Sequence, residues 1–224
     1  MADPLVKICG VTSFEAARAA ALAGADYIGF VFFRKSPRFI PAEEAEDIVV
    51  ELKQASFEGG FVMPQCVGLF VDAGESEISE AAPFLSAAQF HGHESPARCG
   101  ELGQEFGIDV IKALPVSTAD DLKNATAFAE DADLLLFDAK PPTGADRPGG
   151  HGAVFDWALL SAYEGETPFL VAGGLTPHNV ADVVASQRAV AAFAGVDVSS
   201  GVESAPGVKD LAAIKAFVSA AKAS

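Results

Sequence analysis

The stretch LVKICGVTSFEAARAAALAGADYIGF, residues 5–30, decides the fold of this chain. It opens with a short apolar run, Leu5–Cys9, and a second apolar run begins at Tyr27. The alanine-rich segment between them, Ala16–Leu22, has the composition of a helix. The stretch therefore predicts a strand, a helix and a second strand, with the thiol of Cys9 at the exit of the first strand.

The same alternation continues along the chain. Continuous apolar runs are typical of parallel strands that are buried on both faces. Eight such runs predict strands at Leu5–Cys9, Tyr27–Phe32, Cys66–Val71, Ala87–Phe90, Ile108–Lys112, Asp133–Phe137, Phe169–Ala172 and Val190–Gly195. Eight alternations in 224 residues indicate an α/β fold, a (β/α)8 TIM barrel in a single domain over residues 1–224. A doubly wound open sheet is the alternative.

Local signals place some helix ends. Thr12 and Glu15 have the spacing of a capping box, and Gly24 suits the left-handed residue that closes a helix. Thr176, directly before a proline, reads as another N-cap. Lys209–Ala221 is expected to form the last helix.

The composition bounds the class of protein. No apolar run approaches the ~20 residues of a membrane span, and the first residues lack the apolar run of a signal peptide, so we expect a cytoplasmic protein. The net charge of −16 argues against nucleic acid and anionic membranes as partners, and suits a salt-rich host. The three cysteines lack paired spacing, so no disulfide is expected, and Cys66 and Cys99 read as structural.

Two residues at predicted strand ends could carry acid–base chemistry. Strand alternation puts Cys9 one layer above Lys7, whose ammonium would favour a thiolate. Asp138 ends the sixth run, and burial raises the pKa of a carboxyl group, which suits a general acid. The alternatives are a buried cysteine acting as a small hydrophobe and an aspartate that caps a helix or anchors a loop.

Glycine-rich segments follow the last two runs, where barrels usually bind phosphate. They are AGG at 172–174 and GVDVSSG at 195–201. Backbone N–H groups and hydroxyls are good phosphate donors. The candidate phosphate-binding residues are Gly173, Gly174, Ser199, Ser200 and Gly201.

The remaining candidates are an arginine and four histidines. Arg38 follows the second run, where its planar fork could clamp a carboxylate. His91 and His93 form an H-x-H pair of the kind found in metal-dependent amidohydrolase barrels, but His151 and His178 supply no third ligand at a telling spacing. We therefore expect no metal, and no motif for a nucleotide cofactor is present.

Several longer motifs of the sequence are specific to one family. The sequence resembles the phosphoribosylanthranilate isomerase family of tryptophan biosynthesis over nearly its whole length. The matching segments are KICGVTSFEAA from Lys7, GFVFFRKSPRFI from Gly29, VGLFVD from Val67, QFHG from Gln89, LLLFDA from Leu134, FDW from Phe155, VAGGLTPHNV from Val171 and GVDVSSGVESAPGVKD from Gly195.

The resemblance implies roles for the candidates. Cys9 corresponds to the general base, Asp138 to the general acid, Arg38 to the arginine that meets the anthranilate carboxylate, and Asp197 to a position near the ribosyl group. The two glycine-rich segments correspond to the phosphate site. His151 stands in GGHG, where the family usually has GGTG.

The implied reaction is the Amadori rearrangement of N-(5-phosphoribosyl)anthranilate, which needs no metal or redox cofactor. The expected partner is this small-molecule substrate, and monomers and homodimers both fit the family. The nearest rival is the Amadori isomerase of histidine synthesis, which uses two acidic residues where this chain has Cys9 and Asp138. A non-catalytic phosphosugar-binding barrel is the rival from another class.

Overall fold

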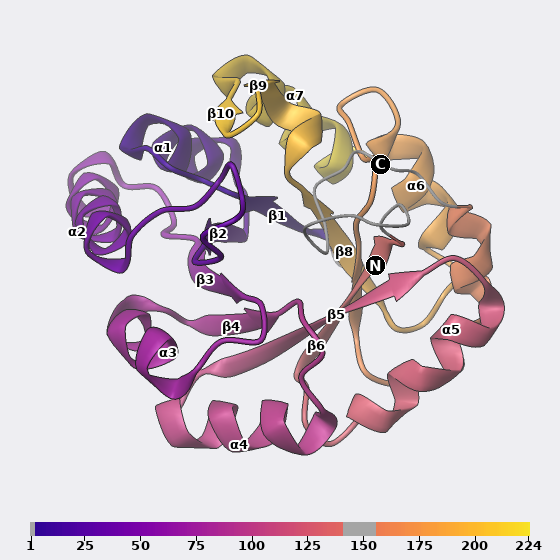
Figure 1. Ribbon diagram of the computed structural model, residues 1–224. Coiled ribbons are helices and arrows are strands. Elements are labelled where there is room, and N and C mark those ends of the chain that lie inside the picture. Colours follow the sequence, from indigo (N-terminus) through magenta and orange to yellow (C-terminus); the bar gives the residue numbers. More distant parts are fainter. Residues whose placement is uncertain (1–2, 141–155) are drawn as a thin grey trace.

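The computed structural model describes residues 3–140 and 156–224. Eight parallel strands pair in chain order, and β8 pairs with β1, which closes a barrel (Figure 1). The strands are β1 (Leu5–Cys9), β2 (Tyr27–Val31), β3 (Gln65–Phe70), β4 (Ala87–Phe90), β5 (Asp109–Val116), β6 (Leu134–Ala139), β7 (Phe169–Val171) and β8 (Phe193–Val198). The predicted (β/α)8 barrel is confirmed, and the open sheet is wrong.

Helices surround the barrel on the outside (Figure 1). The α-helices are α1 (Phe14–Ala23), α2 (Ala42–Gly59), α3 (Glu75–Ala81), α4 (Pro96–Phe106), α5 (Ala119–Lys123), α6 (Val180–Gln187) and α7 (Leu211–Lys222). Short 3-10 turns are η1 (Ala82–Phe84), η2 (Asn124–Phe128), η3 (Trp157–Ala162) and η4 (Ser200–Val202), and a hairpin joins β9 (Glu203–Ala205) to β10 (Val208–Lys209). None of the described helices is long and apolar enough to cross a membrane.

Two apolar layers hold the barrel together, because alternate strand residues point in and out. The outer layer lies between strands and helices and contains most of the large buried side chains, such as Phe30, Phe90 and Phe217. The layer inside the barrel is smaller and uses residues that fit its narrow interior. Its buried members are Val67, Ala87, Ile111, Ala113, Leu134, Leu136, Leu170 and Ala172.

The first helix begins with a different cap from the one that the spacing predicted. Ser13 is the N-cap of α1 and accepts a hydrogen bond from the Ala16 N–H, whereas Thr12 donates its hydroxyl to the carbonyl of Gly207. Thr12 therefore binds the distant hairpin of β9 and β10 instead of capping the helix. The predicted closure at Gly24 is confirmed by its left-handed φ of 91°.

The C-terminal third departs most from prediction. The eighth strand starts at Phe193, not Val190, because the residues before it form the turn that follows α6. This shift places Asp197 within β8, directly opposite Lys7 of β1. The N-cap of α6 is Asn179 rather than Thr176.

The last helix also begins later than predicted. Asp210 is the N-cap of α7 and accepts hydrogen bonds from Ala212 and Ala213. Lys209 therefore lies in β10 and not in the helix. Its side chain is buried and reaches the carboxyl end of β8, where Ser199 follows the strand.

Candidate active site

Cys9 lies at the carboxyl end of β1, above Lys7, as strand alternation predicted. Both side chains are buried, and Gly29 of β2 lies opposite Cys9. A Cβ atom at Gly29 would sit 3.1 Å from the Cys9 sulfur and 3.3 Å from the Lys7 Nζ. The missing side chain at Gly29 thus leaves the space in which the thiol and the ammonium meet.

Lys7 is also bound to Asp197, its neighbour across the β1–β8 junction, at 2.7 Å. Burial opposes the charged ammonium, but the carboxylate of Asp197 and the sulfur of Cys9 together raise the pKa of Lys7 above its ordinary value. Burial also disfavours the charged thiolate and therefore raises the pKa of the Cys9 thiol, and Lys7 only partly offsets this. Lys7 favours the thiolate, as expected, but burial and the carboxylate of Asp197 outweigh this effect, so the net shift of the Cys9 pKa is upward.

Asp138 lies near the carboxyl end of β6 with a polar neighbour at each carboxylate oxygen. Its Oδ1 accepts from the Ala139 N–H at 2.8 Å, and its Oδ2 lies 3.5 Å from Nε2 of His91. Nδ1 of His91 in turn lies 3.3 Å from the amide nitrogen of Gln89. The sequence suggested a role for His91 only as a metal ligand and none for Gln89.

Arg38 is buried in a cluster of charges that the sequence analysis did not find. Its Nε and Nη2 bind the two carboxylate oxygens of Glu203 at 2.7 and 2.9 Å. Lys209 binds the same carboxylate at 2.8 Å. Two cations share one anion, so this buried cluster carries a net positive charge in a chain whose net charge is −16.

Titration of the cluster follows from its burial and its pairing. Although burial opposes the charged carboxylate, Arg38 and Lys209 hold the pKa of Glu203 below its ordinary value. Burial lowers the pKa of Lys209 despite Glu203. This cluster could have been predicted from the sequence, because Glu203 and Lys209 follow the last barrel strand. Charged residues after a barrel strand face the active-site end.

The predicted phosphate residues lie after β7 and β8, at the same end of the barrel. Gly173 and Gly174 have φ of 78° and 67°, a backbone conformation that favours glycine. The hydroxyl of Ser199 donates to the Cys9 carbonyl, and Lys209 donates to the Ser199 carbonyl. The chain after β8 is thereby tied to the exit of β1, with Ser200 and Gly201 continuing it.

The histidines do not converge. His93 is exposed and pairs with Asp72, while His178 is exposed elsewhere and His151 lies outside the described residues. Within residues 3–140 and 156–224, no three His, Cys, Asp or Glu side chains are placed to hold a metal ion.

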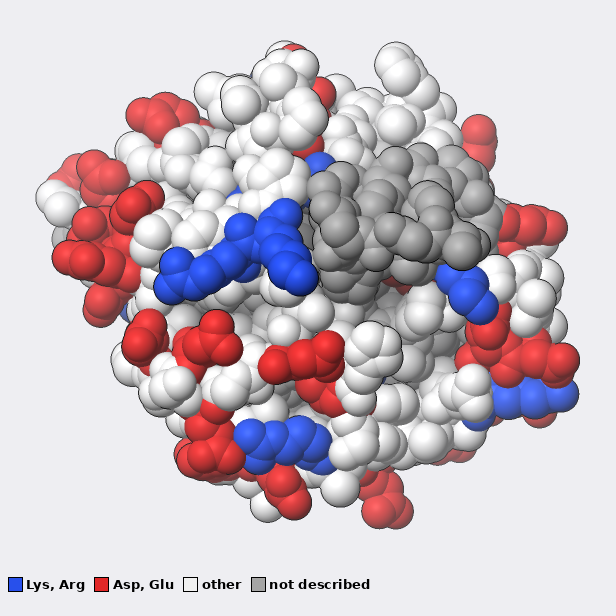
Figure 2. All heavy atoms as spheres, viewed as in Figure 1, with Lys and Arg blue, Asp and Glu red and all other residues white. Residues whose placement is uncertain are grey.

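Charge is unevenly distributed over the face shown in Figure 2. One group of basic side chains lies near its centre beside the grey atoms, and others lie towards its right and lower parts, while acidic side chains occupy its edge and the area below the central basic group. Arg34 and Lys35, in the loop after β2, are exposed. The loop that carries Arg38 thus also presents cations to solvent in a strongly acidic protein.

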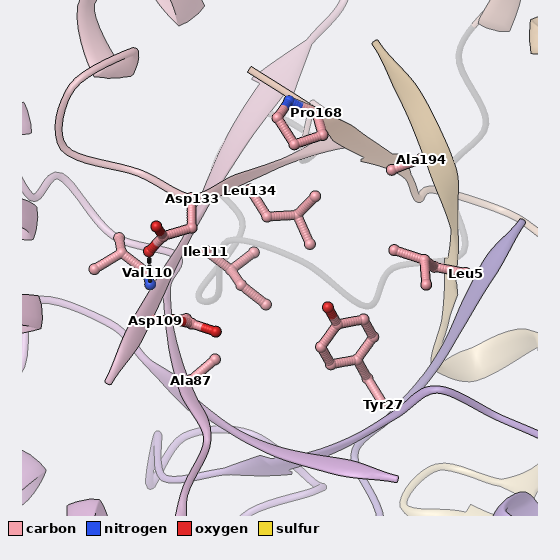
Figure 3. A pocket seen from close by; sticks show the side chains of 10 residues that line it. All are labelled: Leu5, Tyr27, Ala87, Asp109, Val110, Ile111, Asp133, Leu134, Pro168 and Ala194. Carbon is pink, nitrogen blue, oxygen red and sulfur yellow. Dashed lines mark hydrogen bonds between the residues drawn. The ribbon is translucent and has the colours of Figure 1, made fainter. Parts of the chain in front are cut away.

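A pocket of about 170 Å³ lies at the opposite end of the barrel (Figure 3). Residues at the starts of strands line it, including Leu5, Tyr27 and Asp109. It contains none of the candidate site residues. Barrel enzymes place their chemistry at the carboxyl ends of strands, so this pocket belongs to the stability face.

Asp109 at this pocket leads to a stability prediction. Desolvation and the neighbouring Asp133 carboxylate raise the pKa of Asp109. A folded-state pKa above the unfolded value stabilises the fold only at low pH, and this contribution is lost as the pH rises through the folded-state pKa. Asp109→Asn is therefore expected to raise Tm at pH 7 by about 1–2 °C, because exposed positions contribute about 0.5 kcal/mol or less.

Thermal melts at pH 7 and pH 4 check this prediction. The gain should shrink at pH 4, and Asp47→Asn on the exposed face of α2 should show no such pH-dependent gain. A lower Tm for Asp109→Asn at pH 7 would contradict the assignment.

These features define an enzyme of the parallel barrel class, with a thiol, a carboxylate and buried cations at the carboxyl ends of its strands. The family model for N-(5'phosphoribosyl)anthranilate (PRA) isomerase matches residues 6–220. The curated N-(5'-phosphoribosyl)anthranilate isomerase of Rhodospirillum rubrum is 48% identical over 224 residues, covering 99% of both chains. The chain belongs to the N-(5'-phosphoribosyl)anthranilate isomerase family, and it is an isomerase of tryptophan biosynthesis.

Solved structures agree with this assignment. Phosphoribosyl anthranilate isomerase from Thermotoga maritima superposes with a TM-score of 0.83 at 37% identity, covering 99% of this chain and all of that one. A second structure, with a TM-score of 0.79 and 34% identity, covers the same shares and was solved in complex with reduced 1-(o-carboxyphenylamino)-1-deoxyribulose 5-phosphate.

Proposed function

We propose that this chain, as one barrel domain over residues 1–224, rearranges N-(5'-phosphoribosyl)anthranilate to 1-(2-carboxyphenylamino)-1-deoxyribulose 5-phosphate by general acid–base catalysis. The observation that carries the proposal is the placement of Cys9 and Asp138. Cys9 and Asp138 lie at the carboxyl ends of β1 and β6, which meet at the same end of the barrel, and each has polar side chains of the barrel strands beside it. The relative that was solved with a reduced form of this product supports the choice of substrate.

The mechanism needs two proton transfers. Asp138 gives its proton to the ring oxygen of the sugar, the C1–O bond breaks, and the nitrogen lone pair forms a C=N bond. The Cys9 thiolate then takes the proton from C2, and the electrons of that C–H bond form a C1=C2 bond and restore the nitrogen lone pair. The enolamine tautomerises to the aminoketone. Each positioned acid or base contributes about 10²–10⁴ in rate.

The two anionic ends of the substrate would meet different groups. Glu203 occupies Nε and one Nη2 proton of Arg38, which leaves the Nη1 protons for the anthranilate carboxylate. The phosphate would bind the backbone and hydroxyl donors after β7 and β8, and Asp197 would lie near the ribosyl group. The candidate phosphate residues are Gly173, Gly174, Ser199, Ser200 and Gly201.

The setting that we propose is the cytoplasm, with the small-molecule substrate as the partner and no cofactor, nucleic acid or membrane involved. The acidic composition supports the exclusion of nucleic acid. The protein would be a monomer or a homodimer, and a Thermotoga maritima relative is described as dimeric.

Arg38→Ala is expected to raise KM by about 10–100-fold while kcat falls much less, since a hydrogen bond to a charged group contributes about 1.5–3 kcal/mol. Steady-state kinetics on phosphoribosylanthranilate measure both constants. Arg98→Ala removes a partly exposed arginine paired with Glu75 and should change neither. An unchanged KM in folded Arg38→Ala protein would remove Arg38 from the carboxylate site.

A fluorescence assay that follows consumption of phosphoribosylanthranilate tests the proposed function. Turnover of this substrate, but not of the aminoaldose of histidine synthesis, is the expected result. Binding without turnover would favour a non-catalytic phosphosugar-binding barrel, and turnover of the histidine precursor alone would favour the rival isomerase.

A further inference from the structure

A chain of three polar side chains runs from the barrel interior to Asp138. Gln89 lies on the inward face of β4 and is 1% exposed, and His91 follows two residues later. The amide nitrogen of Gln89 lies 3.3 Å from Nδ1 of His91, and Nε2 of His91 lies 3.5 Å from Oδ2 of Asp138. The imidazole therefore bridges an amide and a carboxylate.

The two outer side chains fix the direction of the hydrogen bonds in this row of three. An amide N–H can only donate, so Nδ1 of a neutral His91 must accept and the ring proton must lie on Nε2. Once Asp138 has given up its proton it can only accept, which matches a proton on Nε2. With the amide turned around, Nδ1 would carry the proton, and the bare Nε2 would face Asp138 acceptor to acceptor.

In this orientation the amide oxygen of Gln89 has to be accounted for. Among the described residues, Oε1 of Gln89 has no hydrogen-bond partner, although the residue is almost fully buried. A buried carbonyl without a partner is unfavourable, and such groups in native proteins call for an explanation. Here the explanation is that the amide nitrogen is committed to His91.

We propose that Gln89 is a positioning residue that holds His91 in its Nε2–H tautomer, so that His91 supports the carboxylate of Asp138. This inference rests on the proposed role of Asp138 as the general acid. When Asp138 gives its proton to the ring oxygen, the O–H electron pair stays on the carboxylate. Nε2–H then faces Oδ2 while the Ala139 N–H binds Oδ1, so both oxygens have a donor as the charge forms.

The test replaces Gln89 by methionine, which keeps the length of the side chain and removes both polar groups. The ¹⁵N NMR signals of the imidazole, assigned by their loss in His91→Asn, report the tautomer directly. We expect Nε2–H in the wild type and a tautomer mixture in Gln89→Met. We also expect kcat to fall by about tenfold, the equivalent of one hydrogen bond, with KM within about twofold.

The chain offers a matched control in Gln187. It is also 1% exposed, has an Oε1 without a partner among residues 3–140 and 156–224, and donates its amide to the Trp157 carbonyl in the helix layer. Gln187→Met should lose comparable stability while the His91 signals and kcat stay unchanged. An equal fall of kcat in both variants would mean general loosening of the fold and would overturn the proposal.

The tautomer measurement needs no turnover, so it separates this inference from the proposed function. A proton on Nδ1 in the wild type overturns the inference even if the enzyme is active. Lack of turnover by the wild type would instead sink the proposed function. Should Gln89→Met fail to fold, Gln89→Asn withdraws the donor while keeping an amide, and an unchanged tautomer and kcat there would equally overturn the inference.

Discussion

Replacing Cys9 by serine is expected to lower kcat by about 10²–10⁴ while KM stays within a few fold. The hydroxyl has nearly the same size but ionises far less readily than a thiol, so it cannot take the C2 proton. The ammonium of Lys7 would remain in place through its bond to Asp197, which limits structural change. Steady-state fluorescence kinetics measure both constants.

The pH dependence of the wild type provides a second measurement on the same residue. Because burial raises the pKa of the Cys9 thiol, the thiolate fraction grows as the pH rises above neutrality. The limb of kcat/KM that reports the base should therefore still be rising on the alkaline side of pH 7. Cys99→Ser, a buried thiol of α4, is the control and should leave kcat unchanged. Wild-type turnover in Cys9→Ser would refute the assignment of the base.

Asp138→Asn is expected to lower kcat by a similar factor, about 10²–10⁴. The amide can keep a hydrogen bond from His91, but it has no acidic proton for the ring oxygen. Substrate binding should change little, because Arg38 is separate from this carboxylate and the asparagine side chain keeps the size of the aspartate beside Gly173. Kinetics with the same assay, together with direct binding of the product to the inactive variant, measure the two effects.

Asp133→Asn, beside the same strand, is the matched control. Asp133 lies just before the other end of β6, where its carboxylate accepts from the Val110 N–H at 2.8 Å. Its replacement should affect Tm more than kcat. Turnover near the wild-type level in Asp138→Asn would show that another group supplies the proton.

The barrel and the approximate places of its strands could be predicted because their signals are local. Apolar runs such as Leu5–Cys9 and Leu134–Phe137 identify buried parallel strands without knowledge of their partners. Strand alternation then places Lys7 beneath Cys9, which the structure confirms. The eighth strand was misplaced because apolar residues from Val190 continue from a turn into the strand, and only pairing with β7 sets its start.

The sequence by itself thus determined the (β/α)8 fold and brought Cys9 and Asp138 to one end of the barrel. Tertiary structure alone decided what surrounds them. Arg38 and Glu203 are 165 residues apart and Lys7 and Asp197 are 190 apart, so they meet only when the barrel closes. The net pKa direction of Cys9 was decided there as well, because it depends on how completely packing removes water from the thiol and on which carboxylate shares its neighbouring ammonium.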